Sequence, residues 1–119
     1  MKGSEILNKT LSILGYSEPD GNIHLSQVVR NRALPLLNIC VAELSRCTGV
    51  EYSPIASLSD EINLEGAALY EALPTGMAMY IAVALSDSAA ASFFTEQYRK
   101  KKASLSRVSG IKDTLPRPQ

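Results

Sequence analysis

The feature of the sequence with the strongest structural consequence is a run of nine apolar residues, Met77–Leu85. A helix that crosses a bilayer needs about 20 apolar residues, and this run is bounded by Glu71 upstream and by Asp87 downstream. A membrane span is therefore excluded. The run is either a buried helix or a surface that another copy of the protein covers.

The residues around this run predict a helix from about Leu64 to Leu85. Bulky apolar residues recur every four positions, which is the spacing of one helix face; they are Leu69, Leu73, Met77, Ile81 and Leu85. Met79, Tyr80 and Val83 leave almost no polar side. Because a helix that is apolar all round is buried all round, we expect it to be the central helix, or to be covered partly by neighbouring subunits.

A proline and three small residues distinguish this central helix. Pro74 has no N–H to donate, so we expect it to kink or restart the helix. Gly76, Ala78 and Ala82 have little or no side chain, so they allow neighbouring helices to come close.

Helical periodicity also dominates the rest of the chain, and alternating strand patterns are nearly absent. We expect a first helix that starts with Ser4 as its N-cap and ends at Gly15, and a second helix over residues 26–48 that stops at Gly49. Pro35 falls inside the second helix and predicts a kink or a fresh start there.

The second half of the chain predicts a linker and a last helix. Residues 50–64 have no sustained period, but Ile55, Leu58 and Ile62 can pack this linker against the helices. The last helix is capped by Asp87 or Ser88 and continues to about residue 106.

The expected fold class is therefore all-α, in a single domain of residues 1–108. It is a small bundle of about four helices with a central apolar helix. Residues 109–119 contain one glycine and two prolines, so we expect them to form an extended C-terminal tail.

The charges cancel overall but are unevenly distributed. The chain has 12 basic and 12 acidic residues. From residue 99 onward there are seven basic residues against one acid, Asp113, whereas residues 43–96 hold eight acids against one base, Arg46. This polarity suits head-to-tail contact between copies, and a solvated helix end explains it equally well.

No catalytic or metal-binding pattern is present in the sequence. The only histidine, His24, lies beside a turn, and the acidic pair Asp60 and Glu61 lies in the linker. Cys40 and Cys47 are seven residues apart in a helix, about 10 Å along its axis and beyond the reach of a disulfide. We expect the two cysteines to be small buried hydrophobes, and we expect no enzymatic activity, cofactor, metal or small-molecule substrate.

The strongest charged feature is the basic run Arg99, Lys100, Lys101 and Lys102. Cations at this position match the negative pole of a helix, so the run can be a solvated helix end. It can also contact a phosphate backbone or an acidic protein surface. No aromatic residue is interleaved in the run, which does not favour sequence-specific recognition of DNA.

The order of features resembles that of the small head–tail connector (neck adaptor) proteins of tailed bacteriophages and prophages. The resemblance is best from about residue 58 to residue 102. A linker, LSDEINL, leads into a helix that carries ALPTGMA at residues 72–78; an alanine-rich helix with an aromatic pair, Tyr98 and a basic end follows. Such proteins often show an apolar-Pro-x-Gly-apolar-Ala core and a tyrosine followed by basic residues. Pro35 departs from the pattern, since it falls in a helix that is usually uninterrupted.

The resemblance implies a subunit of a homo-oligomeric ring, a dodecamer, that sits beneath the portal and extends the DNA channel toward the tail. Pro74, Gly76, Ala78 and Ala82 are then core-helix features, and Tyr98 is a packing anchor. The C-terminal segment docks on the portal or on other neck and tail proteins; its docking residues are Ile111, Asp113, Leu115 and Pro116. The basic run lies at an interface or along the DNA channel, where it makes non-specific contact with passing DNA. The expected location is the bacterial cytoplasm during assembly and then the virion neck.

Two alternatives stay open. The first is a small helical regulator that binds nucleic acid through residues 99–102. The second is a monomeric helical adaptor that binds another protein.

Overall fold

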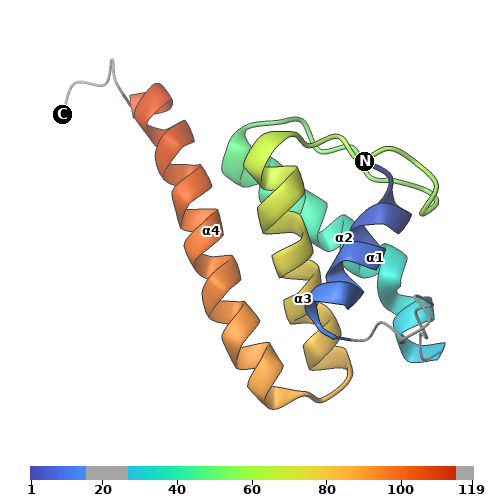
Figure 1. The fold of residues 1–119 in the computed structure, drawn as a ribbon. Coiled ribbons are helices and arrows are strands. Elements are labelled where there is room, and N and C mark those ends of the chain that lie inside the picture. The colour runs from blue at the N-terminus through green and yellow to red at the C-terminus, as the bar shows by residue number, and fades with distance from the viewer. Residues whose placement is uncertain (16–26, 115–119) are drawn as a thin grey trace.

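The computed structural model of the chain is a bundle of helices (Figure 1). It describes residues 1–15 and 27–114, and side chains are described within residues 1–15 and 29–106. The elements are α1 (Gly3–Ile13), α2 (Gln27–Thr48), the π-helical turn η1 (Ala68–Ala72), α3 (Leu73–Ala84) and α4 (Ser88–Thr114). The all-α fold class is confirmed.

Helix α3 lies at the centre of the bundle. It packs against α1, α2 and α4, whereas α1 and α4 do not contact each other within the described residues (Figure 1). Met77, Ala78 and Ile81 are buried, as a central apolar helix requires. Met79 and Tyr80 are half-buried, and Val83 is 61% exposed near the end of the helix.

Pro74 changes the helix geometry without interrupting the helix. Helical structure runs from Gly66 to Ala84, and its second turn is η1. In a regular α-helix the N–H of residue 74 would bond to the carbonyl of Tyr70, and proline has no such N–H. The N–H of Leu73 instead reaches the carbonyl of Ala68, five residues back. The predicted kink therefore takes the form of a widened π turn.

The unpaired carbonyl that Pro74 creates is satisfied from another helix. The Nζ of Lys9, on α1, donates to the carbonyl oxygen of Tyr70 at 2.7 Å. A backbone carbonyl without a partner costs free energy, so this contact stabilises the widened turn and attaches α1 to it.

Three of the predicted helix ends are found where the sequence places them. Gly15 and Gly49 follow α1 and α2 with φ angles of +79° and +78°, a conformation that glycine adopts without a steric penalty. The Oδ1 of Asp87 accepts a hydrogen bond from the N–H of Ala90 at 3.1 Å, so Asp87 caps α4. The expected N-cap Ser4 is wrong. Helix α1 starts at Gly3, because the Oε1 of Glu5 reaches back to the N–H of Lys2 at 2.9 Å.

Helix α2 continues through Pro35 as one element, so the fresh start predicted there is wrong. Its expected beginning at residue 26, and the turn that contains His24, lie outside the described residues. Cys40 is buried and Cys47 is half-buried, and both are free thiols.

The linker between α2 and the central helix packs against the bundle as predicted. Ile55 and Ile62 are each 6% exposed, and Leu58 is half-buried against the core. The side chain of Asn38, on α2, fixes the linker by bonding both backbone groups of Ile55, at 2.9 and 3.0 Å. Two hydrogen bonds to a single residue hold the linker at one position along α2.

Helix α4 is longer than expected. It runs to Thr114, whereas the sequence predicted an end near residue 106 and an extended backbone from residue 109. Gly110 alone costs a helix only about 1 kcal/mol, and the stronger signal is Pro116, which disfavours helical geometry at the preceding residue. No helix in the described ranges has both the length and the apolar character needed to span a membrane.

Candidate functional site

The contact between Gly76 on α3 and Tyr98 on α4 joins the two halves of the bundle. Tyr98 is 1% exposed and is the largest fully buried side chain in the described core. A Cβ atom built on Gly76 would lie 2.6 Å from Cε1 of the Tyr98 ring, closer than carbon atoms can approach. Gly76 therefore allows this ring to pack directly against α3, and Tyr98 is buried at the contact.

A carboxylate on α2 ties both neighbouring helices together. The hydroxyl of Tyr98 donates to Oε1 of Glu43 at 2.8 Å, and the hydroxyl of Tyr80 donates to Oε2 of the same side chain at 3.0 Å. The Nζ of Lys102 lies 4.4 Å above the centre of the Tyr98 ring, within the range of a cation–π contact. Glu43, Tyr80, Tyr98 and Lys102 form a cluster that we call the tyrosine hub.

The electrostatics of this hub favour a structural role. Burial, and then the hydrogen bond to Glu43, raise the pKa of Tyr80 to about 12. Burial also raises the pKa of Tyr98 well above its usual value, and that of the neighbouring Cys40 thiol. The two phenols and the thiol therefore stay protonated at neutral pH, where they can serve neither as nucleophiles nor as bases.

The basic run does not form one continuous positive face, because successive residues of a helix point about 100° apart. Arg99 pairs with Glu96 on the same helix, and this pairing raises the pKa of the guanidinium. Lys101 lies 3.7 Å from the carboxylate of Glu71, and Lys102 covers Tyr98. Lys100 is exposed, and after Arg99 its charge helps to lower the pKa of the Glu96 carboxyl one turn away.

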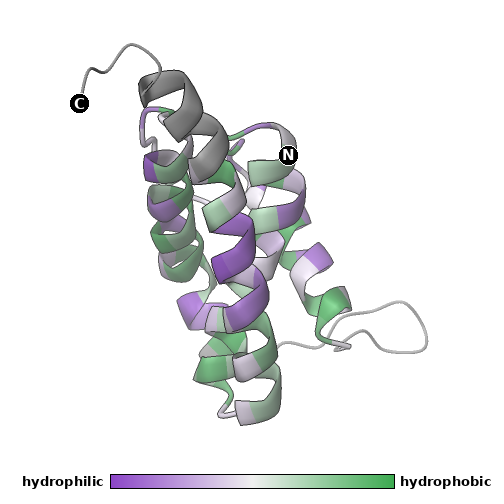
Figure 2. Cartoon of the chain, turned by 90° about the vertical axis from the view of Figure 1, so that its left-hand side faces the viewer, coloured by the Kyte–Doolittle hydropathy of each residue, from purple (hydrophilic) through white to green (hydrophobic). Residues whose placement is uncertain are grey.

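The outer side of α4 changes character along its length (Figure 2). It is hydrophobic near the start of the helix and hydrophilic in the middle. Phe93 is 58% exposed and packs edge-on against Phe94, with ring centres 5.0 Å apart. Tyr70 and Tyr52 are also exposed, at 51% and 44%, and single exposed apolar residues are normal on protein surfaces.

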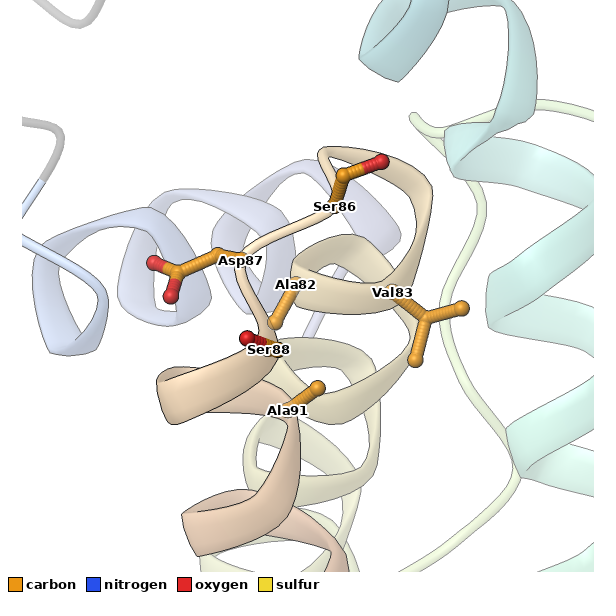
Figure 3. A pocket seen from close by; sticks show the side chains of 6 residues that line it. All are labelled: Ala82, Val83, Ser86, Asp87, Ser88 and Ala91. Atoms are coloured by element: carbon orange, nitrogen blue, oxygen red, sulfur yellow. The ribbon is translucent and has the colours of Figure 1, made fainter.

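A cavity of about 330 Å³ opens at the corner where α3 turns into α4. It is lined by Ala82, Val83, Ser86, Asp87, Ser88 and Ala91. Figure 3 shows small side chains between the two helices, while Val83 and Asp87 point outward on different sides. The lining has no histidine or cysteine and a single carboxylate, so the cavity has no catalytic pair.

The predicted site residues do not gather in one place. Gly76, Ala78, Ala82 and Tyr98 are core residues, and Pro74 is buried beside the π turn. Ile111 and Asp113 lie in the last turns of α4, in the part where only the backbone is described, and Leu115 and Pro116 lie outside the described residues. The basic run lies on α4 between these two groups.

Sequence reasoning missed Glu43, Tyr80 and Phe93 as residues with a role. Glu43 and Tyr80 occupy different helices, so no local spacing connects them, and only the packing of α2 against α3 brings them together. Phe93 had a detectable signal. It is adjacent to Phe94, and two neighbouring helical residues cannot both face the core.

Within residues 1–15 and 27–114, no three His, Cys, Asp or Glu side chains gather in a way that could hold a metal ion. No protein-family model, curated protein or solved structure matches this chain.

Proposed function

We propose that this protein is a non-enzymatic head–tail connector subunit of a tailed phage or prophage. It assembles as a ring beneath the portal and extends the DNA channel toward the tail. The contact between Gly76 and Tyr98 supports this proposal best. These residues belong to the two motifs that carry the resemblance, ALPTGMA and the tyrosine with its basic successors, and they form one packing unit.

The distribution of polar groups supports an assembly role over catalysis or regulation of DNA. The phenols of the tyrosine hub are protonated and donate hydrogen bonds to Glu43, so these side chains hold helices together. Three of the four cations in the basic run have partners within the subunit, so they are less available to phosphate groups. A channel wall should contact DNA without binding it tightly, and a chain with no net charge suits this requirement.

The C-terminal segment is the proposed docking element for the portal. Ile111 and Asp113 belong to an α4 that extends well beyond residue 106. A helix presents its last turns at a fixed distance and direction from the bundle, which suits a docking element.

The test is the mass in solution of the purified chain, alone and mixed with the portal protein encoded in the same genome. We expect several copies of the chain to bind each portal ring. A chain that ignores the portal, and instead binds duplex DNA with a salt dependence equivalent to several phosphates, contradicts the connector proposal and favours the nucleic-acid regulator. A chain that ignores both portal and DNA favours the monomeric adaptor.

Deletion of residues 109–119 tests the docking segment separately. We expect the truncated chain to keep its free energy of unfolding and to lose portal binding. The matched control is a shorter deletion of residues 117–119, which retains the four proposed docking residues and should bind normally. Normal binding by the longer deletion would remove the role assigned to this segment.

A further inference from the structure

The corner between α3 and α4 carries backbone strain that the ends of the first two helices avoid. Ser86 has a φ angle of +59°, in the left-handed region where a side chain crowds the backbone. At the ends of α1 and α2 the same conformation falls on Gly15 and Gly49, which adopt it without this penalty. Ser86 is the one residue other than glycine with a positive φ angle in the part of the chain that the structure describes.

The sequence across this corner can also form one uninterrupted helix. No glycine or proline lies between Gly76 and Gly110, so no strong helix breaker separates α3 from α4. Packing at the corner is incomplete as well, because the cavity of about 330 Å³ opens there between small side chains (Figure 3). A corner that is strained and incompletely packed loses little when it straightens.

Helix α4 is anchored to the bundle chiefly by one side chain. Among residues 88–106, the part of α4 whose side chains are described, only Tyr98 is buried. Its ring packs on Gly76 of α3, and its hydroxyl donates to Glu43 of α2. An element with few buried side chains separates from a fold more readily than the core does. Because a second copy of the chain presents the same residues on its own α2 and α3, that copy can accept this α4 equally well.

We propose that the α3–α4 corner is a hinge through which two copies of the chain exchange their α4 helices. In the exchanged dimer, residues 85–87 become helical, and α3 and α4 continue as one helix. Tyr98 of each copy then packs against Gly76 and Glu43 of the other copy. The contacts of α4 are the same in both forms, so the two forms differ only at the corner and in their dependence on protein concentration. The exchange does not depend on the connector proposal.

Sedimentation equilibrium of the full chain, refolded from urea at concentrations up to about 1 mM, measures the exchange. We expect the wild type to form a dimer in proportion to its concentration. Ser86→Gly should weaken dimerisation roughly a hundredfold, because glycine relieves the strain of the closed corner in both copies and disfavours the continuous helix. The matched control is Ser92→Gly, the same substitution at an exposed position that is helical in both forms. It should leave the dimerisation constant within about threefold of the wild type.

Asp87→Ala should act in the opposite direction to Ser86→Gly. The side chain of Asp87 caps α4 only in the closed corner, and alanine favours a continuous helix. Dimerisation should therefore strengthen roughly tenfold.

Cross-linking shows whether exchanged helices hold the dimer together. The charged groups of Glu71, on η1, and Lys101, on α4, lie 3.7 Å apart. A chain with Glu71→Cys and a chain with Lys101→Cys, each also carrying Cys47→Ser, are refolded together and treated with a short bis-maleimide. The native Cys40 is buried and does not compete for the reagent. Exchange brings the two introduced thiols together, so cross-linked dimers should form in the mixture and not when either chain is refolded alone.

A wild type that stays monomeric at every concentration overturns the exchange, as does a dimer that gives no cross-link in the mixture. A dimer that Ser86→Gly and Asp87→Ala leave unchanged would show that the corner is not the hinge. Each of these results leaves the connector proposal standing, because portal binding is measured separately.

Discussion

The inner and outer faces of α4 differ strongly in how exposed their aromatic side chains are. On the inner face, Tyr98 is 1% exposed, touches Gly76 and donates to Glu43. On the outer face, Phe93 is 58% exposed and packs edge-on against Phe94, and Lys100 is exposed. One helix thus combines the most constrained aromatic residue of the described chain with the most exposed one.

The difference indicates that the stability of the subunit depends more on the inner face of α4 than on its outer face. The inner face holds α2, α3 and α4 together through one ring and one carboxylate. The outer face contributes little to the fold of the subunit. Substitutions on the two faces should therefore change the free energy of unfolding by different amounts.

The largest expected difference is between truncations of the two aromatic side chains. Tyr98→Ala should lower the free energy of unfolding by about 3–5 kcal/mol, because it leaves a cavity in the core and an unpaired carboxylate oxygen on Glu43. Phe93→Ala, on the outer face of the same helix, should lower the free energy of unfolding by less than about 0.5 kcal/mol. Urea unfolding followed by circular dichroism measures both. Equal losses at the two positions would contradict the division between the faces.

Gly76→Ala should be destabilising by about 2 kcal/mol, although alanine normally stabilises a helix by about 1 kcal/mol relative to glycine. The added Cβ meets the Tyr98 ring, which is rigid and has no room to move. In a Tyr98→Leu background the ring is absent, and the same substitution should become neutral or stabilising. A double-mutant cycle by urea unfolding measures this change of sign; a Gly76→Ala variant that stabilises the wild type would show that the contact is looser than described.

Removal of single hydroxyl groups should have a smaller and graded effect. Tyr98→Phe should cost about 1.5–3 kcal/mol, because a hydrogen bond to a charged group is lost in a buried place. Tyr80→Phe should cost less than about 1 kcal/mol, since Tyr80 is only half-buried and water can replace its hydroxyl. Thermal unfolding ranks the two variants, and a larger loss for Tyr80→Phe would reverse the assignment of the anchor.

The smallest expected effect is the change of stability with pH that the titration of Tyr80 produces. The pKa of Tyr80 is raised from 10.0 to about 12 in the folded chain. The folded state therefore holds the phenol proton more tightly than the unfolded state does. Its contribution to stability is therefore complete below pH 10 and is lost as the pH rises through 12. Urea midpoints between pH 8 and pH 12 should fall above pH 10, and less steeply for Tyr80→Phe. An unchanged slope in that variant would mean that other groups cause the fall.

Much of the fold could be predicted from local signals in the sequence. The apolar run predicts the central helix, Gly15 and Gly49 predict two helix ends, and Asp87 predicts the cap of α4, because each of these depends on a few neighbouring residues. The π turn was seen only as a kink at Pro74, because the group that satisfies the Tyr70 carbonyl, Lys9, comes from a different helix.

The candidate site was less predictable for the same reason. Tyr98 and Gly76 were recognised as packing residues from their local setting, but their contact spans two helices. In the sequence, Glu43 is one of several acids in the middle of the chain. Only the packing of α2 against α3 and α4 brings its carboxylate to the hydroxyls of Tyr80 and Tyr98. The basic run looked like a single feature in the sequence, yet the helix sends its four side chains in different directions.

Electron microscopy of the chain mixed with its portal protein tests the connector proposal most directly. We expect a ring of copies coaxial with the portal. A portal without added density, or with scattered single copies in place of a closed ring, would contradict it.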